Sequence, residues 1–265
     1  MPEPDLNFID GHVHTEYCRH ARGRMEEYVE VAVAKGLPGL IFLEHLEIGI
    51  NYPKQTWLDL EEFFLLRAEV ERLADLYRGK IKVGIGVEAG WNPERGKDLA
   101  EFIRAGEWDR VGLSYHFLDI GGEHFNLVSR RQFNLDALAA HGRERVFDRY
   151  LDGIVEALEV IPADTLCHLD APLRYLPGED MAISHADRLD RIFGLIANRG
   201  VALEVNCSGF SIRGEPFPSY ALLERARAAG VRFTIGSDAH RPEDVGRHFL
   251  DLPDWVLSNL IPNQK

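Results

Sequence analysis

Histidines and carboxylates gather where short apolar segments of this chain end. Seven of the eleven histidines lie at or just after such a segment. The first segment ends in His12 and His14, and the last is followed by Asp238 and His240. Alternate residues of a strand share a face, so each pair directs two polar side chains to a face that a buried strand would fill with Val or Ile. Neutral imidazoles and carboxylates bind first-row divalent metals, so the spacing predicts a metal centre.

Nine side chains make up the candidate ligand set. Glu88 ends another apolar segment in register with the histidine-rich ends, which favours a bridging ligand over a helix cap. Nine ligands are more than one tetrahedral ion uses, so we expect two or three divalent ions, Zn, Mn or Fe. The set is His12, His14, His20, His45, Glu88, His116, His168, Asp238 and His240.

Other polar residues are expected to play supporting or structural roles. Glu44 should point away from its neighbour His45 in a strand, so we expect it to support the site without binding metal. Surface or structural roles are expected for the remaining histidines, which are His124, His141, His185 and His248.

Short apolar runs alternate with longer amphipathic segments along the chain, which predicts a parallel sheet with interposed helices. The expected strands are residues 6–9, 40–43, 81–87, 111–115, 165–167, 201–205 and 232–235. The expected helices are residues 25–35, 58–77, 143–160, 186–198 and 221–229.

This order of elements fits either an open doubly wound sheet or a (β/α) barrel. A barrel brings the carboxyl ends of all its strands to one mouth, whereas an open sheet spreads them along an edge. The convergence of polar residues between positions 12 and 240 therefore favours the barrel. Segment 121–134, with few periodic apolar residues, is expected to be an irregular loop near the site.

The composition restricts the classes of function. With 265 residues and 45% apolar content, the chain can bury a sizeable core, and we expect one domain over residues 1–265. A net charge of −13 argues against nucleic-acid binding, and no segment has the roughly 20 apolar residues of a membrane span. The cysteines are Cys18, Cys167 and Cys207, an odd number without a disulfide pattern, which suits a cytoplasmic protein. Nothing in the sequence indicates an oligomeric state.

A set of ordered motifs resembles a known superfamily. The chain carries, in this order, DGHVHTEYCRH, LEH, GVEAGW, LSYHF, CHLD, EVNCSGF and GSDAH. These segments, between residues 10 and 249, resemble the PHP (polymerase and histidinol phosphatase) superfamily, specifically its free-standing histidinol-phosphate phosphatases. The resemblance implies an α/β fold, a distorted (β/α)7 TIM-like barrel of the PHP type, with a trinuclear metal site. The chain departs from the common pattern at Glu44, Cys167 and Tyr115.

The resemblance also implies how the ligands divide among three ions. Glu88 would bridge the first and second ions. The first ion would take His12, His14, Glu88 and Asp238, the second Glu88, His116 and His168, and the third His20, His45 and His240.

The implied reaction is hydrolysis of L-histidinol phosphate to L-histidinol and phosphate. A metal-bridging hydroxide, held by Glu88, Asp238, His12 and His14, would attack phosphorus. Loops after the strands offer candidates for binding the small phosphorylated substrate. Arg174, Asn206, Ser208 and Arg213 are expected near its phosphate, and Asp170 and Glu47 near its cationic end.

Three alternatives remain open at this point. An amidohydrolase-like enzyme would use a modified lysine at a strand end, and no lysine ends a strand here. A PHP-type phosphoesterase could instead act on another small phosphate ester or on a nucleotide diester, although the negative net charge argues against the diester. A metal-storing module without turnover would have a closed site with no position for water.

Overall fold

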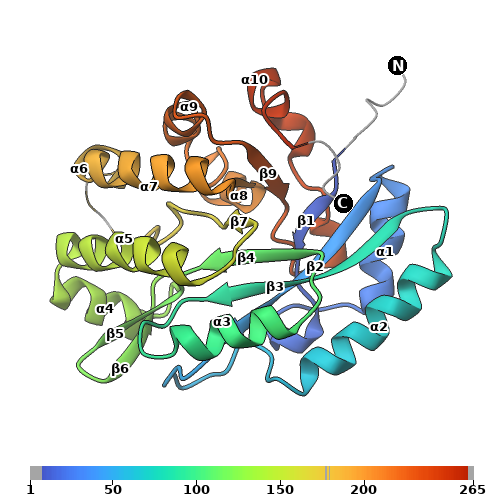
Figure 1. The fold of residues 1–265 in the computed structure, drawn as a ribbon, viewed down its shortest axis with the longest axis horizontal. Coiled ribbons are helices and arrows are strands. Elements are labelled where there is room, and N and C mark those ends of the chain that lie inside the picture. Colours follow the sequence, from blue (N-terminus) through green and yellow to red (C-terminus); the bar gives the residue numbers. More distant parts are fainter. Residues whose placement is uncertain (1–7, 177, 179, 262–265) are drawn as a thin grey trace.

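Seven parallel strands form the central sheet of the computed structural model, which describes residues 8–176, 178 and 180–261 (Figure 1). Their order, β1-β2-β3-β4-β7-β8-β9, follows the chain, as in a (β/α) barrel and unlike a doubly wound sheet, whose order reverses. The strands are β1 (Asp10–Val13), β2 (Gly39–Glu47), β3 (Lys82–Gly90), β4 (Arg110–Ser114), β7 (Thr165–Leu166), β8 (Ala202–Asn206) and β9 (Phe233–Gly236). This confirms the predicted number of parallel strands and the positions of six of them, but the first strand begins at Asp10, after the predicted segment 6–9. Residues 6 and 7 of that segment lie outside the described part of the chain.

The two edge strands of the sheet, β1 and β9, approach each other. The backbone N–H of His14 donates to the carbonyl of Ala239 at 2.9 Å, and Val13 forms an isolated parallel bridge with Ala239. The sheet is therefore a nearly closed barrel rather than an open doubly wound sheet, as the convergence of polar residues predicts.

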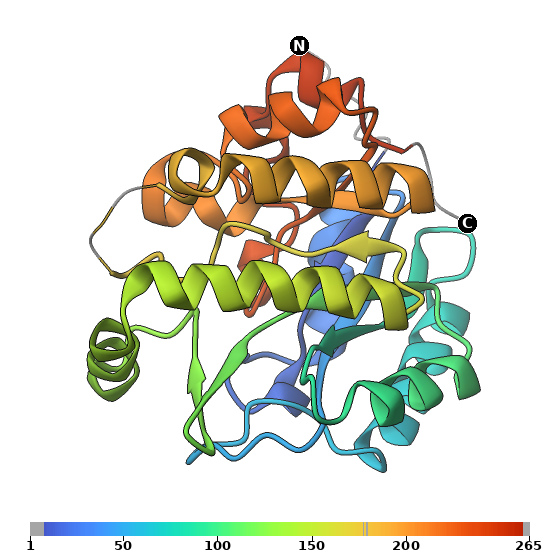
Figure 2. The same cartoon turned by 60° about the vertical axis from the view of Figure 1, so that its left-hand side comes forward.

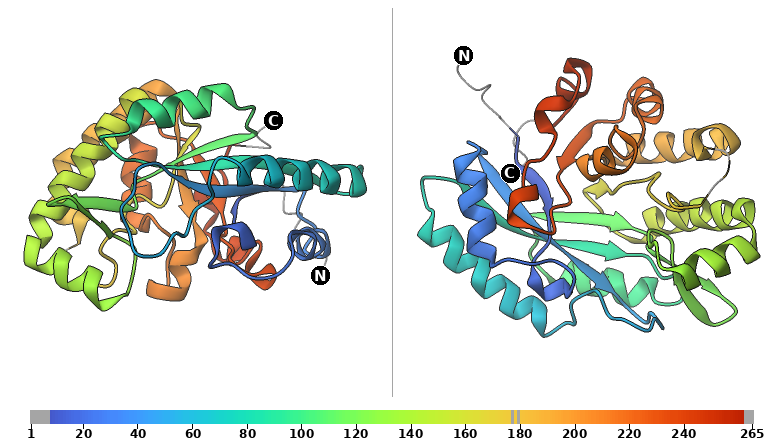
Figure 3. Two further views of the ribbon diagram at one scale, coloured as in Figure 1. Left: turned by 90° about the horizontal axis from the view of Figure 1, so that it is seen from below. Right: turned by 180° about the vertical axis from the view of Figure 1, so that it is seen from behind.

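Helices cover the outside of this barrel (Figures 2 and 3). The α-helices are α1 (Met25–Ala34), α2 (Glu62–Leu76), α3 (Gly96–Ala105), α4 (Gln132–His141), α5 (Arg143–Val160), α6 (Met181–Ser184), α7 (Ala186–Arg199), α8 (Phe210–Arg213), α9 (Tyr220–Ala228) and α10 (Asp254–Leu257). Short 3-10 helices are η1 (Glu16–Cys18), η2 (Cys207–Gly209), η3 (Pro242–Asp244) and η4 (Phe249–Asp251). Within the described ranges, no helix combines the length and the apolar character needed to cross a membrane.

Helix α2 begins four residues later than its apolar periodicity predicts. The backbone N–H of Glu62 donates to the Asp59 carboxylate at 2.8 Å, and the backbone N–H of Asp59 donates to the Glu62 carboxylate at 2.9 Å. This reciprocal pair stops the helix from extending back to residue 58, because side chains already satisfy the N–H groups at its start.

The prediction that segment 121–134 is irregular is wrong. Strands β5 (Phe117–Ile120) and β6 (Glu123–Asn126) form an antiparallel hairpin, and α4 begins at Gln132. The hairpin turn consists of Gly121 and Gly122, whose φ angles are +70° and +90°. Glycine adopts such angles without strain, so the Gly-Gly pair marks a tight two-residue turn instead of a loop.

Candidate metal centre

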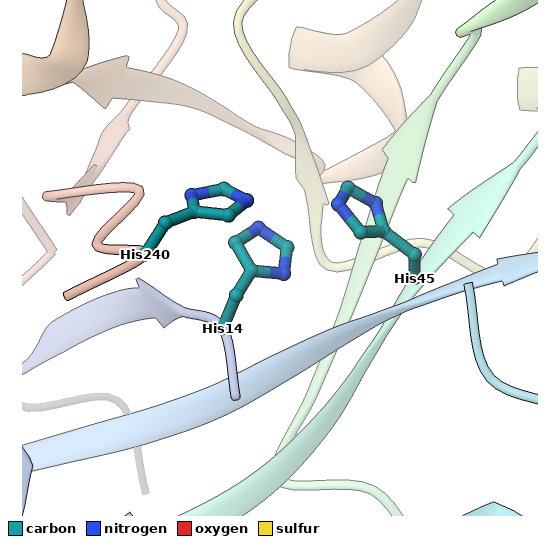
Figure 4. A group of neighbouring side chains, drawn as sticks. All are labelled: His14, His45 and His240. Carbon is teal, nitrogen blue, oxygen red and sulfur yellow. The ribbon is translucent and has the colours of Figure 1, made fainter. Parts of the chain in front are cut away.

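All nine candidate ligands come together at the carboxyl ends of the barrel strands. His12, His45 and Glu88 lie within strands, and His14 directly follows one. The other candidate ligands lie in the connections after β1, β4, β7 and β9, and three of them, His116, His168 and Asp238, are two residues from the end of a strand. Figure 4 shows His14 between His45 and His240, whose ring centroids are 4.2 and 4.3 Å from that of His14. Ligand atoms of these three residues all lie within 4.8 Å of one another. The strand-end pattern therefore places the side chains together in space, as the sequence predicts.

Glu88 lies in the middle of this cluster and is fully buried. Its Oε2 is 2.6 Å from His45 Nδ1 and 3.5 Å from His12 Nε2. Its Oε1 is 2.9 Å from His168 Nε2 and 3.3 Å from His116 Nε2. A carboxylate with different histidines at its two oxygens can join two metal ions.

The backbone fixes which nitrogen of His20 and His240 carries the proton. His20 Nδ1 is 2.8 Å from the Cys18 carbonyl oxygen, and His240 Nδ1 is 3.1 Å from the Asp238 carbonyl oxygen. A carbonyl only accepts, so Nδ1 donates and Nε2 of each neutral ring holds a lone pair. The two Nε2 atoms are 2.8 Å apart. Two lone pairs this close repel unless they share a cation, so the donor set fits a divalent metal ion.

Two buried carboxylates orient histidines by contacting Nδ1, the ring nitrogen farther from Glu88. Glu204 Oε1 is 2.5 Å from His12 Nδ1, and Glu47 Oε1 is 2.8 Å from His116 Nδ1. Both contacts leave the Nε2 atom of the ring on the side of Glu88. A carboxylate in this position fixes the tautomer and makes the ring a stronger metal ligand.

The role of Glu204 is not among the predictions from the sequence, and Glu47 is predicted to lie near the cationic end of a substrate, not beside His116. Glu204 stands in the apolar run 201–205, and an acidic residue inside such a run is a signal for an inward-facing polar partner. Glu44 lies as expected beside the cluster, with Oε2 3.5 Å from His14 Nδ1 and Oε1 accepting from the Thr15 backbone N–H.

Both carboxylates of the predicted ligand set are ionised at neutral pH. Burial raises the pKa of Glu88, but its interactions with the neighbouring imidazoles, led by His45 and His116, outweigh burial and hold that pKa well below its usual value. Burial likewise raises the pKa of Asp238, but the hydrogen bond from His14 and nearby imidazole charge hold it well below its usual value. Ionised carboxylates are the form that binds cations.

The histidines divide into two electrostatic groups. Burial and the neighbouring charge of His14 lower the pKa values of His45 and His240 well below the usual value, so both rings are neutral. Burial by itself lowers the pKa values of His14 and His116, but nearby carboxylates raise these pKa values by more. The resulting pKa is about 9 for His14 and about 10 for His116. These two rings would have to lose a proton in order to bind metal.

Two of the predicted ligands adopt left-handed backbone conformations that non-glycine residues rarely take. The φ angle is +24° at His168 and +52° at Asp238. Nearby carboxylates hold both segments, because the His168 N–H donates to Glu204 at 3.0 Å and the Ser237 N–H donates to Asp10 at 2.9 Å. Strained backbone held by buried hydrogen bonds is typical of functional sites.

Several of the predicted substrate-binding residues contact protein groups. Asn206 Nδ2 and Ser208 Oγ donate to Asp238 Oδ2 at 3.4 and 3.2 Å. Arg213 donates two hydrogen bonds to Asp170, at 2.9 and 3.1 Å. The structure thus pairs two residues that the sequence analysis assigned to opposite ends of the substrate.

A cavity of about 530 Å³ opens beside His20 and His240. Arg174, a predicted phosphate-binding residue, lines this cavity, and Arg213, Asp170 and the other predicted substrate-binding residues are not among its lining residues. The end of the β5–β6 hairpin and the segment after it also line the cavity. The predicted position of segment 121–134 near the site is therefore confirmed, although its predicted irregularity is not.

Three of the four remaining histidines have partners outside the cluster. Their ring nitrogens contact nearby backbone or side-chain groups, which fits the structural roles expected of them. His124 accepts from the Asn51 N–H at 3.2 Å, His185 Nδ1 is 2.7 Å from Ser184 Oγ, and His248 Nδ1 is 2.7 Å from the Asp251 carboxylate.

Comparisons with known proteins agree with this arrangement. A relative from Deinococcus radiodurans, named "Probable histidinol-phosphatase", is 30% identical over 249 residues, which are 91% of this chain and 90% of the relative. A solved structure of a candidate histidinol phosphatase from Listeria monocytogenes has a TM-score of 0.83 at 20% identity, covering 92% of this chain and 100% of its own. The Lactococcus lactis histidinol phosphate phosphatase, solved with zinc, L-histidinol and phosphate, has a TM-score of 0.72 at 24% identity, covering 95% and 89%. The PHP domain family profile matches residues 10–208. This chain therefore belongs to the PHP domain family.

Proposed function

We propose that this chain is a metal-dependent phosphomonoesterase that hydrolyses L-histidinol phosphate to L-histidinol and phosphate. The observation that carries the proposal is the cluster of seven histidines around Glu88 and Asp238, which adjoins a cavity large enough for a small ester. The names of the relatives and the L-histidinol and phosphate bound in the lactococcal structure support this choice of substrate.

Divalent ions would be held by the residues that the sequence predicts, with zinc favoured by the lactococcal complex and manganese or iron as alternatives. We assign Glu88 to the position between two ions, because histidines approach both of its oxygens. When bound, such ions supply positive charge for the phosphate oxygens and lower the pKa of water toward neutrality.

The chain's own residues orient the ligands and the substrate. Glu204 and Glu47 hold the rings of His12 and His116, so that Nε2 of each ring remains available. Arg174 lies in the cavity wall beside the cluster, where its guanidinium can bind the substrate phosphate.

A cysteine nucleophile does not fit the structure. Cys18, Cys167 and Cys207 are all buried, and burial raises the pKa of each thiol. A thiolate is the nucleophilic form, so these side chains stay unreactive at neutral pH. Hydrolysis by water would need no covalent enzyme intermediate.

The test is phosphate release from L-histidinol phosphate by zinc- or manganese-loaded protein, beside a panel of phosphomonoesters and a nucleotide diester. The proposal expects turnover of L-histidinol phosphate that a chelator abolishes and added metal restores. Turnover that survives complete chelation would contradict the metal-dependent mechanism. Turnover of other esters without L-histidinol phosphate would contradict the substrate.

A further inference from the structure

Tyr52 lies in the wall of the cavity beside His20 and His240, on the connection between β2 and α2. Its hydroxyl oxygen accepts a hydrogen bond from the side-chain amide of Asn134, with 2.8 Å between Nδ2 and Oη. Asn134 belongs to α4 and is fully buried. The contact therefore joins a residue of the cavity wall to a polar group of the interior.

The backbone of Asn126 fixes the orientation of the Asn134 amide. The Asn126 N–H donates to Asn134 Oδ1 at 2.9 Å. A backbone N–H can only donate, so the amide oxygen faces Asn126 and the amide NH2 group faces Tyr52. The NH2 group in turn can only donate, and the Tyr52 hydroxyl uses an oxygen lone pair to accept from it. The proton of that hydroxyl is therefore left for another acceptor.

This direction of the hydrogen bond distinguishes Tyr52 from tyrosines whose hydroxyl protons bind the backbone. Tyr28 donates to the Arg22 carbonyl at 2.8 Å, and Tyr150 donates to the Leu169 carbonyl at 2.9 Å. For Tyr52, no protein acceptor of the hydroxyl proton is found among the residues that the structure describes. Tyr52 is only partly buried and lines the cavity, so a molecule bound there can accept this proton.

Aromatic neighbours hold the ring of Tyr52 in place. Its centroid is 4.9 Å from that of Phe117, in a T-shaped arrangement, and 5.8 Å from that of Phe133. The preceding backbone is also held, because the Asn51 N–H donates to His124 Nδ1 at 3.2 Å. A donor that is fixed before the ligand arrives loses less side-chain entropy on binding.

The neighbours of Tyr52 come from the β5–β6 hairpin and α4, which Figure 1 shows together on one side of the barrel, away from β1 and β9. His20 and His240 line the cavity from the segments after β1 and β9. A phosphate at the metal centre thus leaves the rest of the substrate to the wall that contains Tyr52. In L-histidinol phosphate, that part carries an ammonium group and an imidazole. An ammonium group cannot accept a hydrogen bond, whereas a neutral imidazole has one nitrogen that accepts.

We propose that Tyr52 is a specificity-determining residue that donates a hydrogen bond to the neutral imidazole of L-histidinol phosphate. Asn134 is the positioning residue, because its NH2 group occupies a lone pair of the hydroxyl and leaves the proton for the cavity. This inference rests on the proposed function, since it names the part of that substrate which the cavity recognises. An ester whose ring has no nitrogen lacks this hydrogen bond, which corresponds to about five- to tenfold in affinity.

The first test compares two esters that differ in the ring. L-Phenylalaninol phosphate has a phenyl ring in place of the imidazole and keeps the ammonium group and the phosphate. At pH 8, where imidazole is neutral, Tyr52→Phe should lower kcat/KM for L-histidinol phosphate by about five- to tenfold, mainly through KM. The value for L-phenylalaninol phosphate should not change.

Tyr77→Phe is the matched control for this test. Tyr77 lies between the carboxyl end of α2 and the amino end of β3, away from the mouth of the barrel, and its loss of a hydroxyl should alter neither ester. Equal losses for both esters in Tyr52→Phe would mean that the hydroxyl serves the phosphate or the fold. That result, or no loss for L-histidinol phosphate, would overturn the proposal.

The second test reverses the hydrogen bond while Tyr52 is retained. In Asn134→Asp both side-chain oxygens accept, so the Tyr52 hydroxyl donates to the carboxylate and not to the substrate. Residue 134 is the third residue of α4, where the helix dipole favours a negative charge. The variant should lose kcat/KM for L-histidinol phosphate as Tyr52→Phe does, and the double variant should lose no more than either one. Wild-type kinetics in Asn134→Asp, or fully additive losses, would overturn the role of Asn134. Tyr52→Phe leaves the interior unchanged, so the first test decides the role of Tyr52 even if Asn134→Asp destabilises the protein.

Binding of the alcohol product separates this inference from the proposed function. In titration calorimetry on zinc-loaded protein with phosphate, Tyr52→Phe should weaken L-histidinol by about five- to tenfold relative to L-phenylalaninol. If this shift is found but no phosphate ester is cleaved, the imidazole contact stands and the proposed function fails. If L-histidinol phosphate is cleaved and Tyr52→Phe treats both alcohols and both esters as the wild type does, the proposed function stands and this inference fails.

Discussion

The imidazole of His12 and the carboxylate of Glu204 meet inside the barrel, with 2.5 Å between Nδ1 and Oε1. Glu204 also accepts from the backbone N–H of His168 at 3.0 Å and from the Asn206 side chain at 3.1 Å. One carboxylate on β8 therefore holds a ring on β1 and the strained backbone that follows β7. The orientation of two predicted metal ligands depends on this one side chain.

Glu204→Gln should lower metal affinity with little change in the fold. The amide keeps the size of the carboxylate but loses its charge, so it makes His12 a weaker ligand and can turn its ring. Loss of such a partner costs about 10- to 100-fold in metal affinity. Competition with a coloured zinc chelator measures this effect. The control is Glu101→Gln on the exposed face of α3, and equal zinc affinity in both variants would contradict the positioning role of Glu204.

Gly236→Ala should destabilise the protein, because Gly236 packs against the contact between His12 and Glu204. A Cβ atom at Gly236 would lie 2.5 Å from His12 Cβ and 2.6 Å from Glu204 Oε1. Overpacking of this kind costs about 1–3 kcal/mol in the free energy of unfolding. Urea unfolding measures the change. Gly194→Ala is the matched control, because no described atom beyond its chain neighbours and the backbone of its own helix lies within 4 Å of a Cβ there, and alanine favours the helix α7. An unchanged midpoint for Gly236→Ala would contradict the close packing.

The sequence predicts which candidate ligands cluster better than it predicts the residues that support the cluster. The ligands follow from a general property of parallel barrels, since every strand delivers its carboxyl end to one mouth. Glu204 could not be assigned to His12 in the same way, because the two residues are 192 positions apart and meet only when β8 and β1 close around the interior. Glu47 and Asp170 follow the same strand-end rule, but their partners depend on side-chain directions that no periodicity encodes.

Removal of metal should lower the thermal stability of the protein. The Nε2 atoms of His20 and His240 face each other at 2.8 Å, an arrangement that a shared cation stabilises. A ligand that binds only the folded state raises the free energy of unfolding by about 2.7 kcal/mol when its concentration is 100 times its dissociation constant. Melting curves with chelator, and then with added zinc, should show Tm falling and recovering. A Tm that changes neither with chelator nor with added zinc would contradict a metal site in the fold.

The three cysteines should resist thiol reagents in the folded protein. Burial raises the pKa of Cys167 to about 12, and burial also raises the pKa values of Cys18 and Cys207. The thiolate reacts, and at pH 8 a thiol with that pKa is ionised in roughly one molecule in ten thousand. Titration with a disulfide reagent should label no cysteine quickly in the native protein and all three in denaturant. Rapid native labelling of any one of them would contradict the burial.

Arg174→Ala should weaken substrate binding and leave the metal content intact. Arg174 lines the cavity beside His20 and His240, and its guanidinium lies 5.3 Å from the centre of the Phe217 ring. Without a guanidinium at that position, the substrate phosphate loses a charge-assisted partner, and KM should rise by about tenfold or more. Kinetics on L-histidinol phosphate, with zinc measured in the same samples, separates the two effects. Arg174→Lys, which keeps the charge but not the two-pronged geometry, should fall between the wild type and the alanine variant. A loss of zinc that matches the loss of activity would instead make Arg174 a support of the metal centre, because substrate binding alone does not change the metal content.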